Sequence, residues 1–415
     1  MDYLGTANTQ FGFNLFKKLN KIKDGNIFFS PLGMSTAFGM LFLRNQGDTS
    51  KQLQKMLCSE KDPEGPRIKT EEKEVGRHVF HFQYGCFLEV GSLGQCIDQM
   101  EKTEEVHHQF PKILSELGKS TDDYEVKIAN RLFGEKTYLF LQKYLDYVEK
   151  YYHASMEPVD FINAADESRK KINAWVESQT NEKVKDLLLD GSINSSTKLV
   201  VVNIVYFKGQ WDSEFKKENT KEEDFWLTKN VSKSVPMMIQ EHSFSYVSLE
   251  DLQSRILGIP YKNNNLSMFI LLPDDVDGLE KIIDKLTPEN LVEWTSPGRM
   301  EQRDVCLHLP RFEVEDSYDL EALLAALGMQ DSCQELGAHS PGESSHSGLQ
   351  AQKFLHKSFV AVKEEGTETS AGTGVGFVVT SAPASESFHC NHPFLFFIRR
   401  RDSDNVLFFG RYSSP

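Results

Sequence analysis

The stretch "LVVVNIVY", from Leu199 to Tyr206, constrains the fold more than any other part of this chain. It is almost continuously apolar and rich in β-branched residues, a composition that favours a strand. A strand without alternating polar residues leaves no face for water, so it is expected at the centre of a sheet that is covered on both sides. The chain must therefore build a sheet deep in its interior.

Three further apolar runs predict strands in the second half of the chain. They are "LSMFILLP" (Leu266 to Pro273), "HPFLFFIRR" (His392 to Arg400) and "DNVLFFGRYSSP" at the end of the sequence. A short polar turn separates the last two runs, so we expect them to form a hairpin.

Helical periodicity marks the first half of the chain. Apolar residues recur at helical spacing near the N-terminus, and "DESRKKINAWVESQTNEKVKDLL" predicts two helical pieces joined at Thr180–Asn181. The apolar positions of these helices are Leu4, Ala7, Phe11, Leu15, Leu19 and Ile22, then Ile172, Trp175, Val176, Val184 and Leu187. Helices early and strands late favour an α+β fold over alternating βαβ units. No linker separates two halves, so residues 1–415 are predicted to form a single domain.

Charge and composition narrow the choice of partners. The net charge is −15, and no basic run is longer than Arg399–Arg401. We therefore expect neither nucleic acid nor a membrane as a partner, and we expect a monomer. The N-terminus has no basic and apolar leader, which predicts a cytoplasmic protein, with leaderless release to the extracellular space as an alternative.

Six cysteines lie scattered without a C-x-x-C pair, a pattern that predicts reduced thiols. The sequons at Asn194, Asn230 and Asn265 are then expected to stay unmodified. Residues 76–100 follow an acidic loop and show only weak periodicity of their apolar residues. They are predicted to be an inserted loop. Residues 331–348 have few apolar anchors and are also predicted to be a loop.

A search for catalytic chemistry finds one dense cluster, "HCNH" from His389 to His392. Its residue types suit a thiol protease or a metal site, but neighbouring strand residues point to opposite faces. His392 also precedes a proline and an apolar strand, which favours a packed, hydrogen-bonded histidine. No hydrolase or zinc motif is present. We expect no catalytic residue, no metal and no cofactor, and hence no enzyme.

The segment "EEGTETSAGTGVGFVVTSAPASESF", Glu364 to Phe388, is built mainly of small residues. Its glycines lack the spacing of a nucleotide-binding loop. Written as a strand, one face carries Thr367, Thr369, Ala371, Thr373 and Val375, all small enough to enter a packed interior. The other face carries Glu368, Ser370, Gly372, Gly374 and Gly376. Such a segment can join a sheet as an added strand, or it can remain a flexible surface loop.

Four blocks of the sequence resemble signature blocks of the serpins, in the same order and spacing. They are "NIFFSPLGMSTAFGM", "LVVVNIVYFKGQW", "EEGTETSAGT" and "FHCNHPFLFFIR". The start and the ending "LFFGRYSSP" resemble the intracellular, ovalbumin-like branch. The resemblance implies the α+β serpin fold, in which helices pack around three β-sheets and a reactive-centre loop is exposed near the C-terminus.

The resemblance also implies a suicide inhibitor whose partner is a target protease. Residues 364–388 would be the reactive-centre loop, with Thr380–Ser381 as the bond that is cut. Once cut, the loop would insert into the central sheet of a metastable native fold and deform the attached protease. The implied hinge comprises Glu364, Glu365, Gly366 and the inward-facing Thr367, Thr369, Ala371 and Thr373.

Further positions match the family one by one. Ser30, Asn203 and His356 match polar residues under the opening of the central sheet, and Trp211 matches the tryptophan where insertion begins. Each of them also suits ordinary satisfaction of polar groups in a core. Gly33 stands where many serpins have a serine, so one hydrogen bond is expected to be missing there. Thr369, Ser370 and Gly372 replace alanines with other small residues.

The residues that would recognise the protease are Phe377, Val378 and Val379. The loop has no Arg or Lys, which argues against a trypsin-like target. Papain-like proteases read the second residue before the cut, here the apolar Val379, so a cathepsin of the L or K type is expected. The alternatives are an elastase-like protease that accepts Val379 or Thr380, a chymotrypsin-like protease that cuts after Phe377, and a non-inhibitory serpin-fold binding protein.

Overall fold

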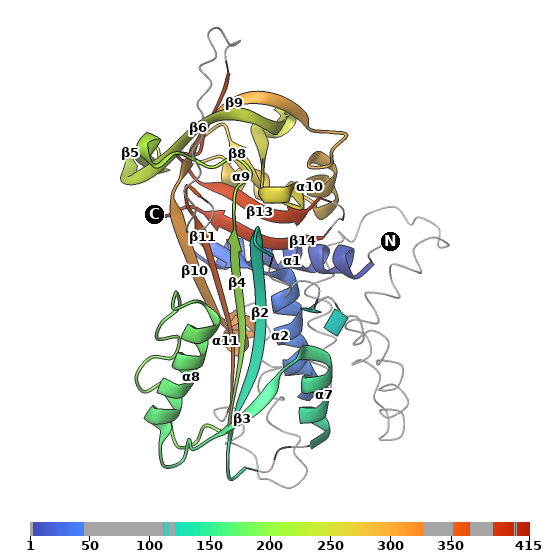
Figure 1. Cartoon of the computed structure of the whole chain (residues 1–415), viewed down its shortest axis with the longest axis vertical. Coiled ribbons are helices and arrows are strands. Elements are labelled where there is room, and N and C mark those ends of the chain that lie inside the picture. Colours follow the sequence, from blue (N-terminus) through green and yellow to red (C-terminus); the bar gives the residue numbers. More distant parts are fainter. Residues whose placement is uncertain are drawn as a thin grey trace, which may run out of the picture.

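The computed structural model describes residues 3–44, 111–112, 114–115, 121–138, 140, 142–326, 352–365, 385–401, 403 and 405–415. Two hydrogen-bonded sheets organise this part of the chain (Figure 1). A narrow sheet runs along the long axis of the molecule, and a larger sheet lies at one end of it. None of the described helices is long and apolar enough to cross a membrane.

The narrow sheet has five described strands in the order β10-β11-β4-β2-β3, and β4 is central among them. The strands are β2 (Tyr124–Glu135), β3 (Ser155–Val159), β4 (Leu199–Gly209), β10 (Phe312–Asp319) and β11 (Gln352–Val362). The prediction of a central strand at Leu199–Tyr206 is confirmed.

Both faces of β4 are buried, as its apolar sequence requires. Val201 and Val205 belong to the main core, which includes Phe38 of α2. The alternate residues Val202 and Ile204 belong to a second core that contains Ile172 of α8. Helices α2 (Pro31–Arg44) and α8 (Ala165–Gln179) therefore cover opposite faces of the same sheet.

The larger sheet has nine described strands and bends through one long strand, β6 (Val231–Leu249). The others are β1 (Ile27–Phe29), β5 (Lys221–Thr228), β7 (Ser254–Pro260), β8 (Leu266–Pro273), β9 (Glu301–Pro310), β12 (Glu386–His389), β13 (Phe394–Arg400) and β14 (Val406–Tyr412). One part of β6 pairs with β7, and β6 also pairs with β5 and β9. Counting the two parts of this sheet separately gives the three sheets that were expected.

The predicted strand at Leu266–Pro273 and the C-terminal hairpin are confirmed. Strands β13 and β14 pair antiparallel, with Phe397 opposite Phe409. Helix α1 (Tyr3–Ile22) is also confirmed, and its Phe11, Leu15 and Leu19 are buried. The remaining described helices are α7 (Gln142–Tyr152), α9 (Leu279–Ile283), α10 (Pro288–Trp294) and α11 (Leu320–Ala326), with short 3-10 turns η1 (Lys217–Asn219), η2 (Glu250–Leu252) and η3 (Lys262–Asn264).

The second helical piece, predicted after Thr180–Asn181, is wrong. Helix α8 ends at Gln179, and Asn181 and Glu182 both adopt left-handed backbone angles, with φ of 48° and 61°. The backbone N–H of Val184 instead donates to the hydroxyl of Thr180 over 3.1 Å. Val184 is still fully buried, so the apolar positions were correct but the chain presents them from an irregular segment.

The two predicted loops, residues 76–100 and 331–348, lie outside the described residues. Of the six cysteines, Cys306 and Cys390 are described, and both are free thiols, as predicted.

Candidate functional site

The segment predicted to be a reactive-centre loop leaves the narrow sheet at the end of β11. Strands β11 and β4 are parallel neighbours, paired from Gln352 opposite Leu199 to Val360 opposite Phe207. Their last residues, 361–362 and 208–209, extend beyond this shared register. The two strands thus stop pairing at the end from which residues 363–365 depart.

Trp211 closes this end of the sheet. Its side chain is buried and stacks on Tyr261 with ring centroids 4.5 Å apart. The indole Nε1–H donates to the carbonyl of Lys363 over 2.8 Å, and the backbone N–H of Trp211 donates to the carbonyl of Glu365 over 3.3 Å. The tryptophan therefore binds the first residues of the predicted hinge directly.

Of the two described hinge residues, Glu364 and Glu365, Glu364 is the better anchored. It is 2% exposed, and its carboxylate accepts hydrogen bonds from Thr220 Oγ1 at 2.8 Å and from Arg311 Nη1 at 3.1 Å. Its carbonyl accepts from the backbone N–H of Phe215 over 2.8 Å. These bonds give a buried carboxylate the partners that its burial requires.

Glu365, the next residue, points to a more open surface. Its carboxylate pairs with Nζ of Lys217 at 2.8 Å, and this hydrogen bond raises the pKa of the exposed lysine. The hinge thus begins with one ion pair whose carboxylate is buried and one ion pair at the surface.

Asn203 and His356 meet in the middle of the sheet. They are register partners on β4 and β11, and His356 Nδ1 donates to Asn203 Oδ1 over 2.5 Å. Asn203 Nδ2 donates in turn to Asn130 Oδ1 over 2.5 Å, and Asn130 Nδ2 donates to the carbonyl of Tyr152 over 3.0 Å. A row of side-chain hydrogen bonds therefore crosses β11, β4 and β2.

His356 is neutral in this row. It is fully buried, and burial, with a smaller contribution from Lys357, lowers its pKa to about 3. Because Nδ1 donates to the oxygen of Asn203, the proton of the neutral ring sits on Nδ1. Nε2 has no hydrogen-bond partner among the described residues.

Ser30 supports this row of hydrogen bonds indirectly, through helix α2. Its hydroxyl accepts the backbone N–H of Gly33 over 3.1 Å at the start of α2, which is the geometry of a helix N-cap. Thr36 Oγ1 donates to the carbonyl of Gly33 over 2.8 Å and accepts from Asn203 Nδ2 over 3.3 Å. Ser30 thus caps the helix whose Thr36 contacts Asn203. The sequence alone did not predict this role of Thr36.

Gly33 allows α2 to approach the sheet closely. A Cβ atom at this position would lie 2.5 Å from Cγ2 of Val205, too close for the present packing. A serine therefore fits here only if Val205 or the helix shifts, which accounts for the glycine.

The remaining predicted site residues lie outside the described part of the chain: Gly366, Thr367, Thr369, Ala371, Thr373, Phe377, Val378, Val379, Thr380 and Ser381. Their roles stay predictions. The structure brings together Asn203 with His356, and Trp211 with Lys363 and the hinge residue Glu365.

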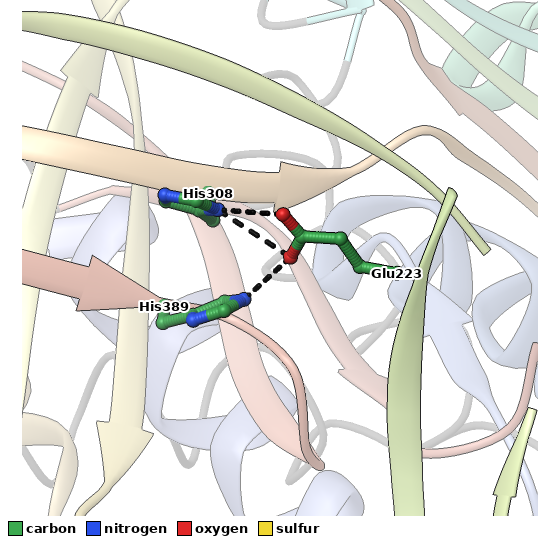
Figure 2. A group of neighbouring side chains, drawn as sticks. All are labelled: Glu223, His308 and His389. Carbon is green, nitrogen blue, oxygen red and sulfur yellow. Dashed lines mark hydrogen bonds and ion pairs between the residues drawn. The ribbon is translucent and has the colours of Figure 1, made fainter. Parts of the chain in front are cut away.

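A second polar cluster lies where the loop returns to the fold. Figure 2 shows both rings of His308 and His389 directed at the carboxylate of Glu223. His389 Nε2 lies 2.7 Å from Glu223 Oε2, and His308 Nδ1 lies 3.2 Å from Glu223 Oε1. Burial and the neighbouring His389 lower the pKa of His308 against the opposing effect of Glu223.

The prediction for His392 is confirmed. Its ring is 7% exposed, and its Nε2 lies 2.6 Å from the carbonyl of Pro273. Only His389 of the "HCNH" cluster reaches the group of Glu223 and His308. Sequence reasoning missed that group because Glu223 lies far away along the chain.

Comparison with known proteins agrees with this geometry. Residues 6–415 match the family model described as serpin (serine protease inhibitor). The chain is 66% identical to Serpin B13 of Homo sapiens over 415 residues and 41% identical to the leukocyte elastase inhibitor of Equus caballus over 420 residues, with all of each chain covered. It is similar to the crystal structure of uncleaved ovalbumin, with a TM-score of 0.75, 33% identity and 99% of each chain covered.

The family expected from the four sequence blocks is thus shown, together with its α+β fold, and relatives in it are named as protease inhibitors. This chain belongs to the serpin family.

Proposed function

We propose that this protein inhibits a protease as a suicide substrate, by inserting its cut reactive-centre loop between β4 and β11. The observation that carries the proposal is the parallel pairing of these two neighbouring strands, with the loop leaving from the end of β11. The family and the names of its relatives support the general function of protease inhibition.

The topology favours insertion at this one place in the sheet. A segment that leaves the end of β11 and folds back must run antiparallel to β11, and therefore antiparallel to β4 as well. Insertion would replace one parallel pairing with two antiparallel pairings, which are slightly more stable per residue. The released free energy would drive the change, and an uncut loop, joined to β11 at one end and to β12 at the other, could not insert fully before it is cut.

The contacts at the hinge support the same starting point. Trp211 and Glu364 tie the chain to the end of the sheet where β4 and β11 cease to pair. Insertion would begin there and advance past Asn203 and His356. The hydrogen bond between those two residues would have to break, because a strand would come between them.

The chemistry of trapping follows from cleavage at Thr380–Ser381. The nucleophile of the protease would attack the carbonyl of Thr380, and Ser381 would leave as a new amino terminus. Residues 364–380, inserted at about 3.3 Å per residue, would carry the acyl-linked protease roughly 55 Å along the sheet. Deformation at the far end would prevent water from completing hydrolysis.

The proposed target is a papain-like cysteine cathepsin of the L or K type. The apolar Val379 lies two residues before the proposed cut, where these proteases select an apolar side chain, and the loop lacks Arg and Lys. We further propose that the protein acts as a monomer in the cytoplasm, with release without a leader as a second route.

An elastase-like or chymotrypsin-like serine protease is the second candidate. One relative, 41% identical, is named leukocyte elastase inhibitor, and Val379 and Phe377 are residues that such enzymes accept. A serpin-fold binding protein without inhibitory activity is the remaining alternative.

Mass spectrometry of the reaction distinguishes these targets. The full chain is incubated with an equal amount of a cathepsin L-type protease, an elastase or a chymotrypsin, and residual activity is measured. We expect the cathepsin to lose activity and to yield residues 381–415, whereas cuts after Val379 or Phe377 would yield 380–415 or 378–415. An elastase that cuts after Thr380 would also yield 381–415, so in that case the target is identified by which protease loses activity.

Val379→Glu and Val378→Glu form a matched pair. Recognition by a papain-like protease predicts that Val379→Glu slows the cut far more than Val378→Glu. Full cathepsin activity with no cut between residues 378 and 382 would overturn the cysteine-protease assignment and leave the inhibition of serine proteases to be decided by the other two reactions.

A further inference from the structure

Three strands bring metal-ligand side chains to one place beside the C-terminal stem of the loop. Glu223 comes from β5, His308 from β9 and His389 from β12 (Figure 2). One ligand atom from each residue lies within 4.8 Å of the others. All three side chains are partly buried, so they are held by the surrounding fold and can still be reached from solvent.

The residue types are those that hold zinc. Two imidazoles and one carboxylate form a known zinc ligand set, with a fourth tetrahedral position open to water. Tetrahedral zinc with bonds of about 2.0–2.1 Å needs ligand atoms roughly 3.3 Å apart. His389 Nε2 and His308 Nδ1 already lie 2.7 Å and 3.2 Å from oxygens of Glu223, so small side-chain movements would suffice.

Cys306 supports the orientation of one ligand. Its Sγ lies 3.7 Å from Nε2 of His308, on the opposite side of the ring from Glu223. Histidines that bind metals commonly donate their second N–H to an acceptor that fixes the ring. This contact would keep Nδ1 of His308 directed at the carboxylate, and it leaves Cys306 outside the ligand set.

The backbone holds the two histidines in place independently of the side chains. Strands β9 and β12 are parallel, and His308 and His389 are register partners. The N–H of Cys390 donates to the carbonyl of His308 over 2.9 Å. Beyond the cluster, the N–H of Trp226 on β5 donates to the carbonyl of Asn391 over 2.7 Å. The backbone positions of the three ligand residues are therefore fixed before any metal arrives.

We propose that Glu223, His308 and His389 bind a divalent transition metal of the zinc class, which ties β12 to β5 and β9. Strand β12 has four residues and, among the described strands, pairs only with β9. It follows directly after the proposed reactive-centre segment. The metal would thus fasten the stem of the loop on the side that stays behind after cleavage at Thr380–Ser381.

The test measures zinc binding by the full chain after chelator treatment. The chain has twelve histidines, several of them outside the described residues, so the informative quantity is the difference between variants. Isothermal titration with zinc alone should show one site in the wild type that is at least tenfold weaker in His389→Gln and in Glu223→Gln. The zinc-dependent rise in melting temperature should shrink in the same variants.

Two matched variants complete the experiment. His242→Gln changes an exposed histidine on β6 and should bind zinc like the wild type. Cys306→Ser should keep the site with at most a modest loss of affinity. Hydrogen exchange gives a local readout, since zinc should slow the exchange of residues 386–389 in the wild type and in His242→Gln alike.

The proposal is overturned if Glu223→Gln and His389→Gln bind zinc as tightly as the wild type. It is also overturned if Cys306→Ser abolishes binding, because the thiol would then be a ligand and the set would be a different one. Melting curves without zinc show whether each variant is folded, and these outcomes do not depend on any protease.

Discussion

His356 Nδ1 donates a hydrogen bond of 2.5 Å to Asn203 Oδ1, and the two residues face each other on the parallel strands β11 and β4. This bond joins the two strands that the proposed loop insertion would have to separate. Its continuation through Asn130 makes the closed sheet depend on a buried polar row as well as on its backbone ladder. Asn203 and His356 therefore stabilise the uncut protein and also lie where the proposed insertion would separate the strands.

Asn203→Leu should destabilise the uncut protein. It removes the acceptor of His356 and the donor to Asn130, and leaves both groups buried. Each buried group left without a partner costs about 1–3 kcal/mol, so for two groups we expect a loss of about 2–6 kcal/mol. Thermal unfolding of the uncut variant measures it, with the exposed His242→Leu as control. A loss equal to that of the control would contradict the importance of the row.

Because His356 is buried as a neutral ring, the uncut protein should become less stable as the pH decreases. Its pKa is about 3 in the fold, against an ordinary value of 6.5. As the pH falls from 6.5 toward 3, the unfolded chain binds a proton that the folded chain excludes, so the free energy of unfolding decreases. At about 1.4 kcal/mol per pH unit, roughly 2 kcal/mol is lost by pH 5.

His356→Gln tests this assignment. It removes the titrating ring, so its melting temperature should change less between pH 7 and pH 5 than that of the wild type. Equal changes in the two proteins would assign the pH dependence to other groups.

The two ion pairs of the hinge should differ in their effect on stability. Arg311→Ala leaves the buried carboxylate of Glu364 with one side-chain partner fewer and should cost about 1–2 kcal/mol. Lys217→Ala breaks the exposed pair with Glu365 and should cost less stability than Arg311→Ala, because solvent screens exposed charges. Unfolding curves of the two variants provide the comparison. An equal or larger loss of stability in Lys217→Ala would show that the burial of Glu364 does not make its ion pair the more stabilising one.

The sequence predicts the parts of the fold that repeat a simple pattern. Continuous apolar runs identified the central strand at Leu199–Tyr206 and the C-terminal hairpin, because burial on both faces leaves a local signature. The segment after Thr180 has apolar spacing that suits a helix, but left-handed angles at Asn181 and Glu182 override it. The spacing of apolar residues does not show that Asn181 and Glu182 adopt left-handed backbone angles.

The candidate sites show the same division. Asn203 and His356 were identified from the family resemblance, and the structure shows that they are register partners on neighbouring strands. Thr36 was missed because its contact with Asn203 depends on how closely α2 packs at Gly33. Glu223 was missed because its partners His308 and His389 are 85 and 166 residues away, on strands joined only by the fold.

Thr373→Arg should turn the inhibitor into a substrate. Residue 373 lies on the face of the loop that would enter the sheet, so arginine would bring an unpaired charge into a packed interior. Recognition should survive, because the change lies seven positions before Thr380. The variant should be cut and released, leaving the protease active.

The register control for this variant is Ser370→Arg, which places the same charge on the opposite face. It should inhibit better than Thr373→Arg when the number of inhibitor molecules used per inactivated protease is measured. Inhibition by Thr373→Arg at the wild-type stoichiometry would contradict the assigned face.

The most direct test of loop insertion is the melting temperature of the protein before and after cleavage of its loop. A protease that cuts within residues 366–384 without being trapped supplies the cleaved form, and both forms are heated under the same conditions. Insertion between β4 and β11 would complete the sheet, so the account predicts a much higher melting temperature for the cleaved protein. An unchanged melting temperature would contradict insertion, and with it the proposed mechanism of inhibition.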